Sequence, residues 1–245
     1  MTATLVIDTS IHGAVIGLAR ASDARLQYVQ ASPDVTDSAK LLSVMVADGL
    51  SKLGLKEVDV SKIVVSQGPG SFTGIRVGLA YGSGFLAGLL SASVEDPKIL
   101  GLSSLVELGK WFYRRAKNDV VLFLPSTKTS GYAVCVNGER VRSISIDATR
   151  QNLAVLFHDY ETSHWVVIGD WPAISDLASS RSVKSQDSLS SREAALKAVH
   201  VMAEVAQDNK NLGWARMLTD EMPGAIYLRK STVEERASDS VLGEK

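Results

Sequence analysis

The chain has 245 residues, with 45% hydrophobic and 22% charged side chains and a formal net charge of −1. This length suits one large domain or two modest ones, and the balanced charge argues against a free-standing nucleic-acid binder, which usually carries an excess of Lys and Arg. The single cysteine, Cys135, excludes a disulfide framework and favours a reducing, cytoplasmic location; we expect neither a signal peptide nor a membrane span.

In chain order, the first half predicts strands at 4–8, 14–20 and 26–30, a helix at about 38–53, a strand at 62–66 and a helix that ends near Leu90. The second half predicts strands at 120–124, 132–136 and 140–146, a helix near 151–158, a strand at 165–168 and a helix at 191–207. Both halves have the order β-β-β-α-β-α, without sequence identity between them. This repeated order is typical of an α/β protein built from two ribonuclease-H-like domains of the actin-like ATPase superfamily, each a mixed sheet with helices.

A glycine-rich turn joins the strand at 62–66 to the following helix. It contains Gly68, Gly70 and Ser71, and Thr73 is placed to cap the helix. Such a turn brings backbone N–H groups to a helix N-terminus, where an anion or another backbone can sit. It is not a Walker loop, because no Lys-Ser or Lys-Thr pair follows the glycines, and its glycine spacing is one residue too long for a dinucleotide fingerprint.

The helix after this turn carries glycines in its interior, each of which costs roughly 1 kcal/mol relative to alanine. Packing must therefore hold the helix together. At about 100° per residue one helical face collects Gly74, Gly78, Tyr81, Gly82, Phe85, Gly88 and Leu89. Two interpretations stay open from spacing alone: close packing against the protein's own sheet, or a docking surface for a second protein.

Two segments carry a family resemblance. The string Gly-Pro-Gly-Ser-Phe-Thr-Gly-Ile-Arg at 68–76, within the segment 67–77, and the hydrophobic start Leu-Val-Ile-Asp-Thr-Ser at 5–10 resemble TsaB, a tRNA threonylcarbamoyladenosine biosynthesis protein. The resemblance is strong over 4–108 and returns at 223–229 with a Tyr-Leu-Arg ending.

This resemblance implies a non-catalytic scaffold that binds and activates a TsaD-like transferase, which modifies the tRNA adenosine next to the anticodon. The glycine face and the helix at about 38–53 would form the interface. It also implies a TsaE-like ATPase in the same complex, a homodimer when the chain is alone, and contact with tRNA only through the complex. No cofactor is expected, with ATP or ADP at the partner interface left open.

The resemblance also suggests the domain limits. The first, partner-binding domain is placed at 1–108 and a divergent second domain at 109–209. A C-terminal helix at about 210–229 is expected to return to the first domain, followed by a polar tail at 230–245.

The rival interpretation is an enzyme, an actin-like nucleotide phosphotransferase or ATPase that uses Asp8 and the turn from Gly68 to Gly74. The turn after the first strand contains Asp8, Thr9 and Ser10 and lies where that fold binds the phosphates of its nucleotide. Arg76, shortly after the glycine-rich turn, is a further candidate for a position near the nucleotide. The alternative is that Asp8 ties its own turn through the hydroxyls of Thr9 and Ser10, which we favour. No metal site is predicted, because the four histidines lack a metal-binding spacing.

The second half departs from the family at the loop from Pro125 to Gly131. Where the family has an acid-rich string, this chain has proline, serines and threonines, and only Tyr132 is kept. We expect the loop to have lost the family's role.

A basic, aromatic segment occupies 110–117, with Arg114, Arg115 and Lys117 at its end. The amphipathic end of a helix explains it better than contact with RNA.

Overall fold

The computed structural model describes residues 2–20, 23, 25–34, 38–92, 94–138, 140–147, 163–172, 174 and 185–207. The helices expected near 151–158 and at about 210–229, the segment 223–229 and the tail 230–245 lie outside these residues. No helix in the described part of the chain is long and apolar enough to cross a membrane.

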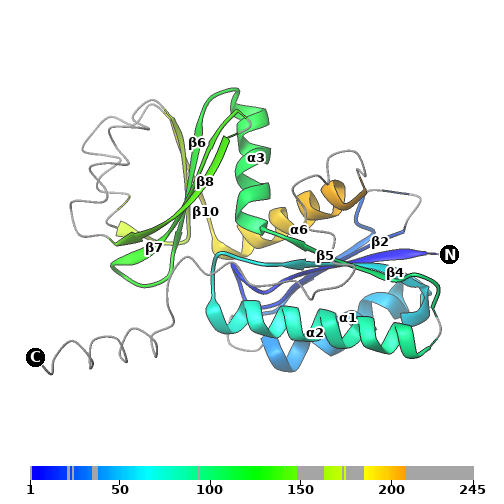
Figure 1. Ribbon diagram of the computed structural model, residues 1–245. Coiled ribbons are helices and arrows are strands. Elements are labelled where there is room, and N and C mark those ends of the chain that lie inside the picture. The colour runs from blue at the N-terminus through cyan, green and yellow to red at the C-terminus, as the bar shows by residue number, and fades with distance from the viewer. Residues whose placement is uncertain are drawn as a thin grey trace, which may run out of the picture.

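Within the described residues, ten strands form two five-stranded sheets with the same topology (Figure 1). The first contains β1 (Ala3–Asp8), β2 (Val15–Arg20), β3 (Tyr28–Ala31), β4 (Val60–Ser66) and β5 (Lys98–Leu102), in the spatial order β3-β2-β1-β4-β5. The second contains β6 (Val120–Pro125), β7 (Ser130–Asn137), β8 (Arg140–Asp147), β9 (His164–Ile168) and β10 (Ser185–Leu189), in the order β8-β7-β6-β9-β10.

The pairing directions also repeat. In each sheet the first three strands form an antiparallel meander. The fourth strand pairs in parallel with the first, and the fifth pairs in parallel with the fourth. Short turns can join antiparallel strands, whereas parallel neighbours need a crossover connection such as a helix. The two ribonuclease-H-like halves predicted from the element order are therefore confirmed.

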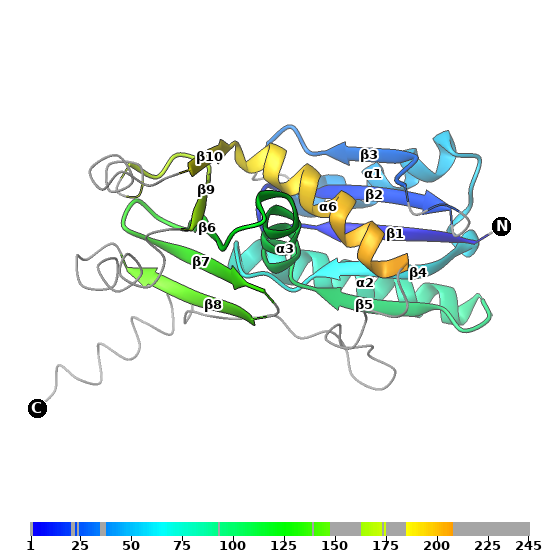
Figure 2. The ribbon, with the colours of Figure 1, turned by 90° about the horizontal axis from the view of Figure 1, so that it is seen from above.

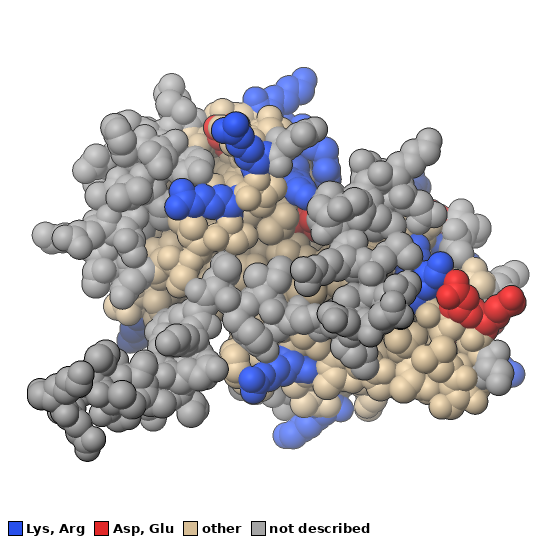
Figure 3. All heavy atoms as spheres, viewed as in Figure 1, with Lys and Arg blue, Asp and Glu red and all other residues tan. Residues whose placement is uncertain are grey.

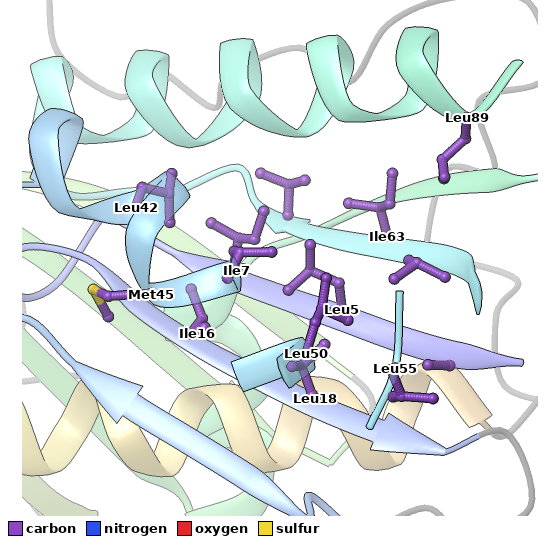
Figure 4. Close-up of a cluster of buried hydrophobic side chains, with 14 of the residues drawn as sticks. Leu5, Ile7, Ile16, Leu18, Leu42, Met45, Leu50, Leu55, Ile63 and Leu89 are labelled. Atoms are coloured by element: carbon purple, nitrogen blue, oxygen red, sulfur yellow. The ribbon is translucent and has the colours of Figure 1, made fainter. Parts of the chain in front are cut away.

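Two helices cover one face of the first sheet. They are α1 (Ser38–Lys52) and α2 (Phe72–Ser91), which lie side by side (Figure 1). The main core lies beneath them, where Leu5 and Ile63 of the sheet meet Leu42 of α1 and Leu89 of α2 (Figure 4). A short 3-10 helix, η1 (Glu57–Asp59), leads into β4.

The other two described helices connect the halves. Helix α3 (Ser104–Ala116) follows β5 but packs on β6 and β7 of the second sheet, and α6 (Ser191–Gln207) follows β10 but lies across β1 and β2 of the first (Figure 2). Val199 and Met202 of α6 belong to the same buried cluster as Val6 and Val64. The packing of α6 thus crosses the limit of the second domain placed at 109–209.

The predicted strands and helices within the described residues are present, with boundaries shifted by one or two residues at most ends, and the helix at 191–207 is matched in full. Four of the described elements were not predicted or not predicted in full: η1, β5, β10 and the full extent of α3. The sequence of β5, Lys-Ile-Leu-Gly-Leu, contains a glycine and no alternation, and β10, Ser-Gln-Asp-Ser-Leu, is polar. Neither has the hydrophobic period by which strands are recognised.

Candidate partner interface

The turn after β1 is organised by Asp8, whose side chain is completely buried. Its Oδ1 accepts hydrogen bonds from the backbone N–H of Ser10 at 2.7 Å and of Ile11 at 3.3 Å. The Ser10 hydroxyl donates to the same oxygen at 3.1 Å. A carboxylate that bonds backbone groups two and three residues ahead closes a tight turn, so Asp8 fixes the path of the chain from β1 toward β2.

Three serine hydroxyls form a closed triangle beside this carboxylate. Ser10 Oγ lies 3.0 Å from Ser66 Oγ and 2.9 Å from Ser104 Oγ, and the last two lie 2.9 Å apart. The serines come from the β1–β2 turn, the end of β4 and the first residue of α3. All three are buried. Because buried hydroxyls need hydrogen-bond partners, this triangle fastens three elements that are far apart in sequence.

Burial raises the pKa of Asp8 above its ordinary value, although the hydrogen bonds from Ser104, Ser10 and Ile11 act in the opposite direction. The second carboxylate oxygen, Oδ2, is buried and has no hydrogen-bond partner within the described residues. Since burial penalises the charged form, the site favours a neutral carboxyl group at a higher pH than an exposed aspartate would. Asp8 thus ties the turn through Ser10, as expected, but the hydroxyl of Thr9 takes no part, because Thr9 Oγ1 is buried and has no hydrogen-bond partner within the described residues.

The glycine-rich turn closes against the first turn. The backbone N–H of Ser71 donates to the carbonyl oxygen of Ser10 at 2.8 Å, and a Cβ at Gly70 would collide with that same carbonyl group. The backbone φ of Gly68 is 88°, which residues with a Cβ rarely adopt. The N–H of Gly68 donates a hydrogen bond to Ser66 Oγ at 3.2 Å. The backbone of Ser10 therefore fills the space in front of this turn, so the turn does not form an open anion-binding site.

The helix cap is Ser71 and not Thr73, which corrects the prediction. Helix α2 begins at Phe72, and Ser71 Oγ accepts a hydrogen bond from the N–H of Gly74 at 3.1 Å. Thr73 lies inside the first turn and is exposed. The N-cap is the residue just before the first helical residue. The Ser-Phe-Thr string has two hydroxyl residues close to the helix start, so the sequence alone did not show which of them is the cap. The Arg76 guanidinium lies 4.0 Å from the centre of the Phe72 ring.

The predicted glycine face points inward, which corrects the docking interpretation for most of its members. A Cβ at Gly74 or Gly78 would collide with Thr9, and one at Gly82 would lie 2.6 Å from a methyl carbon of Val65. Leu89 is buried in the core. The spacing identified a real face, but a helical projection does not say which way that face points. Close packing on the protein's own sheet explains these residues.

The remaining members of that face lie at its margin. The rings of Tyr81 and Phe85 are half-buried against the core, with centroids 6.1 Å apart, and burial raises the pKa of Tyr81 to about 12. Gly88 is exposed, and a Cβ added there would meet nothing within 4 Å.

A different surface of the two helices faces outward. We call it the outer helical face, formed by Val44, Ala47, Ala80, Gly84, Ala87, Gly88 and Leu90. Val44 of α1 is 61% exposed and Leu90 of α2 is 58% exposed. Among the described residues they are the two most exposed large apolar side chains. The positions on α2 recur every three or four residues, so they form one continuous stripe of small or apolar side chains.

The loop that departs from the family is a tight hairpin between β6 and β7. The N–H groups of Ser126 and Thr127 both donate to the carbonyl oxygen of Ser130 at 2.8 Å, and the hydroxyls of Thr127 and Ser130 lie 2.7 Å apart. Lys128 stands exposed at the tip. The polar side chains thus serve the turn itself, while the loss of the family's role stays a prediction.

Sequence reasoning missed one buried acid, Glu107 of α3. Its side chain is 1% exposed, and Lys110 Nζ lies 3.7 Å from Oε1. Neither carboxylate oxygen has a hydrogen bond within the described residues, and burial raises the pKa of Glu107 to about 7. The available signal was a lone acid among apolar neighbours, in Leu-Val-Glu-Leu.

Comparisons with known proteins agree with this fold. A model of the TsaD family, tRNA N6-adenosine threonylcarbamoyltransferase, matches residues 35–94, and no curated protein matches the chain. The solved structure of YeaZ from Pseudomonas aeruginosa is 18% identical, with 93% of this chain and 100% of that chain covered and a TM-score of 0.63. A second structure, described as an uncharacterized protein with similarity to peptidase YeaZ from the same organism, is 18% identical, with 94% and 100% covered and a TM-score of 0.64.

A Bacteroides thetaiotaomicron protein described as having an actin-like ATPase fold is 9% identical, with 82% of this chain and 95% of that chain covered; its TM-score is 0.44. At 18% identity the two full-length matches establish the fold. They confirm, at that level, the resemblance to YeaZ (TsaB) read from the sequence. The TsaD-family match spans α1, β4 and α2, the part of the chain that carries the outer helical face.

Proposed function

We propose that this chain is a non-catalytic subunit of a tRNA-modifying complex, and that its outer helical face binds a TsaD-like transferase. In that complex it would activate the transferase for threonylcarbamoylation of the adenosine next to the tRNA anticodon. The observation that carries the proposal is the exposure of small and apolar side chains along α1 and α2. Apolar surface that stays exposed in the described part of the chain can mark an interaction site.

The family match supports the choice of partner. Residues 35–94 are similar to the TsaD family, so a TsaD-like protein would present a related pair of helices. Two related helical faces can pack together about a pseudo-two-fold axis, as identical faces do in symmetric dimers. Ala80 and Gly84 would allow the two α2-type helices to approach closely, and Leu90 and Val44 would be removed from water.

The same geometry accounts for a homodimer in the absence of the partner. Val44 and Leu90 leave water whether the second face belongs to a relative or to another copy of the chain. A TsaE-like ATPase in the complex, and ATP or ADP at the partner interface, stay predictions.

A non-catalytic role is favoured over the enzyme alternative because of the state of the turn. Asp8 Oδ1 is engaged by two backbone N–H groups and a hydroxyl, and the turn from Gly68 to Gly74 is packed against Ser10. A phosphate would have to displace backbone contacts to reach either. The alternative, an actin-like nucleotide phosphotransferase or ATPase, predicts ATP turnover by the pure chain that depends on Asp8.

The test is co-purification of the full chain with the TsaD-like subunit of the same organism. We expect a stable complex, lost in Ala80→Arg and in Gly84→Arg, because each places a long charged side chain on the outer helical face. Ala116→Arg is the matched control, an exposed position on α3 away from this face. If no complex forms with the unaltered chain, the proposed function is wrong. If both α2 variants bind as well as the control, the partner uses another surface.

A further inference from the structure

Two cationic side chains, Arg115 and Lys197, lie over the ring of Trp111 where α3 and α6 meet, and three more stand on α3 or just after it. Helix α3 contributes Lys110, Arg114 and Arg115, with Lys117 just after its end, and α6 contributes Lys197. We call this set, with Trp111, the tryptophan patch. Lys and Arg side chains gather at the top of the molecule in Figure 3, around the outer end of α3.

Trp111 is held between cations from two helices. The Arg115 guanidinium carbon lies 4.6 Å from the ring centroid and Lys197 Nζ lies 4.8 Å from it. The edge of Phe112 supports the same ring, with centroids 4.9 Å apart. Cation–π contacts of this kind hold long side chains in defined positions at the surface. The patch is therefore preorganised, although Arg115, Lys117 and Lys197 are exposed.

Lys110 is the one cation of the patch that is paired within the described residues, with Glu107 at 3.7 Å. Among the described residues, no carboxylate lies within ion-pair distance of Arg114, Arg115, Lys117 or Lys197. Two nearby acids are otherwise engaged: Glu107 is buried beside Lys110, and Glu193, four residues before Lys197, accepts hydrogen bonds from Ser190. Asp119 accepts a hydrogen bond from the Asn137 amide at 2.7 Å. Gathered like charges repel one another, so such a cluster gains when an anion joins it.

A helix C-terminus explains only part of the set. Cations in the last turn interact favourably with the helix dipole, which accounts for Arg114 and Arg115. Lys197 lies in the middle of α6, where that effect is absent, yet it points to the same ring. A ligand with several negative groups explains why cations from both helices converge.

We infer that the tryptophan patch binds phosphate groups of the RNA backbone. This rests on the proposed function, in which the RNA is the tRNA held by the complex. Guanidinium groups bind phosphate through paired hydrogen bonds, and each neutralised phosphate releases counterions. The patch lies on the α6 side of the first sheet, whereas α1 and α2 cover its other face (Figures 1 and 2). Docking on the outer helical face therefore leaves the patch open to RNA.

The overall charge of −1 agrees with a supporting contact and not with independent binding. A patch of five cations in a nearly neutral protein binds nucleic acid weakly and loses affinity steeply with salt. Most of the affinity for tRNA would then come from the complex, and the patch would add to it and orient the RNA.

The test compares two triple variants of the full chain in complex with the TsaD-like subunit, by fluorescence anisotropy with unmodified tRNA. Arg114→Ala with Arg115→Ala and Lys117→Ala removes three cations from the patch. Arg25→Ala with Lys56→Ala and Lys128→Ala removes the same charge from exposed positions elsewhere. We expect the patch variant to lose about tenfold in affinity at moderate salt and to lower the slope of log K against log salt by about two, and the control to change little.

Equal affinities and slopes for the two variants would overturn the inference. Loss of the TsaD-like subunit from the patch variant in the absence of RNA would also overturn it, because the patch would then bind an acidic surface of the partner. If the unaltered chain does not form the complex, the proposed function fails. The anisotropy is then measured on the isolated chain, where a difference between the two variants still supports RNA binding at the patch and no difference excludes it.

Discussion

Thr9, the residue after β1, lies directly against Gly78 in the second turn of α2, and its hydroxyl oxygen occupies the space that a Cβ at position 78 would need. The same residue blocks a Cβ at Gly74 through its carbonyl oxygen. The first two turns of helix α2 therefore pack directly against the residue that follows β1, with no room for a side chain at Gly74 or Gly78. This contact fixes which side of α2 is available to a partner.

Replacing Gly78 is expected to destabilise the protein, not to yield a folded chain that only fails to bind. Gly78→Ala gains about 1 kcal/mol in helix propensity but forces Thr9 and α2 apart, which typically costs 1 to 3 kcal/mol or more. We expect a lower midpoint in urea unfolding. Gly84→Ala is the matched control, because a Cβ there meets nothing within 4 Å, and it should unfold at the same or a higher urea concentration. A Gly78→Ala protein as stable as the control would show that the contact relaxes freely.

Asp8 provides a test of structure against catalysis. Asp8→Asn keeps an oxygen that can accept from Ser10 and Ile11, so we expect stability within about 1 kcal/mol of the original and full tRNA modification by the complex. Asp8→Ala leaves the backbone N–H groups of Ser10 and Ile11 without their acceptor, at roughly 1 to 3 kcal/mol for each unsatisfied group, and should lower Tm clearly, although the Ser10 hydroxyl keeps Ser66 and Ser104 as partners. Both are measured by thermal unfolding and by modification of tRNA. ATP turnover by the isolated chain that disappears in Asp8→Asn would instead support the enzyme alternative.

Glu107 should make stability depend on pH. Burial raises its pKa to about 7 in the folded protein, above the ordinary value of 4.5. The folded state then binds the proton more tightly than the unfolded state, so this contribution is complete below pH 4.5 and is lost as the pH rises through about 7. A shift of this size corresponds to about 3 kcal/mol at most.

The corresponding variant is Glu107→Gln, which keeps the shape and removes the titration. We expect it to unfold at a higher urea concentration than the original protein at pH 8, and the difference between the two to shrink steadily toward pH 5. An advantage that stays constant across this range would show that the carboxyl group does not titrate with a raised pKa.

The hairpin tip offers a prediction of no effect. Lys128 is exposed, and the hydrogen bonds that shape the turn come from Thr127 and Ser130. Lys128→Ala should leave binding of the TsaD-like subunit and tRNA modification nearly unchanged. A loss of tenfold or more in either, about 1.4 kcal/mol, would show that the loop has kept a function despite its altered sequence.

Patterns in the amino-acid sequence predicted most of the local elements and their order. Alternation and β-branched runs predicted β1, β2, β4, β6 and β7, the 3.6-residue period predicted α1 and α6, and the repeated order predicted two ribonuclease-H-like halves. The sequence also indicated that Asp8 closes its own turn. These features depend on residues close together in the chain, whose preferences act before any long-range contact forms.

How distant residues meet depends on long-range packing, which no local pattern predicted. The helical period correctly placed Gly74, Gly78 and Gly82 on one face of α2. It could not show whether that face points inward or outward, because the opposite stripe of α2 is also made of small residues. Strands β5 and β10 gain their hydrogen bonds from neighbours and not from a pattern of their own.

The crossing of α6 onto the first sheet, the hydroxyl triangle of Ser10, Ser66 and Ser104, and the approach of Lys197 to Trp111 all join residues far apart in the chain; Ser10 and Ser104 alone are 94 positions apart. The physical reason is common to all of them. A side chain's neighbours across a packed interface are set by how whole elements stack, and that information is spread over the entire chain.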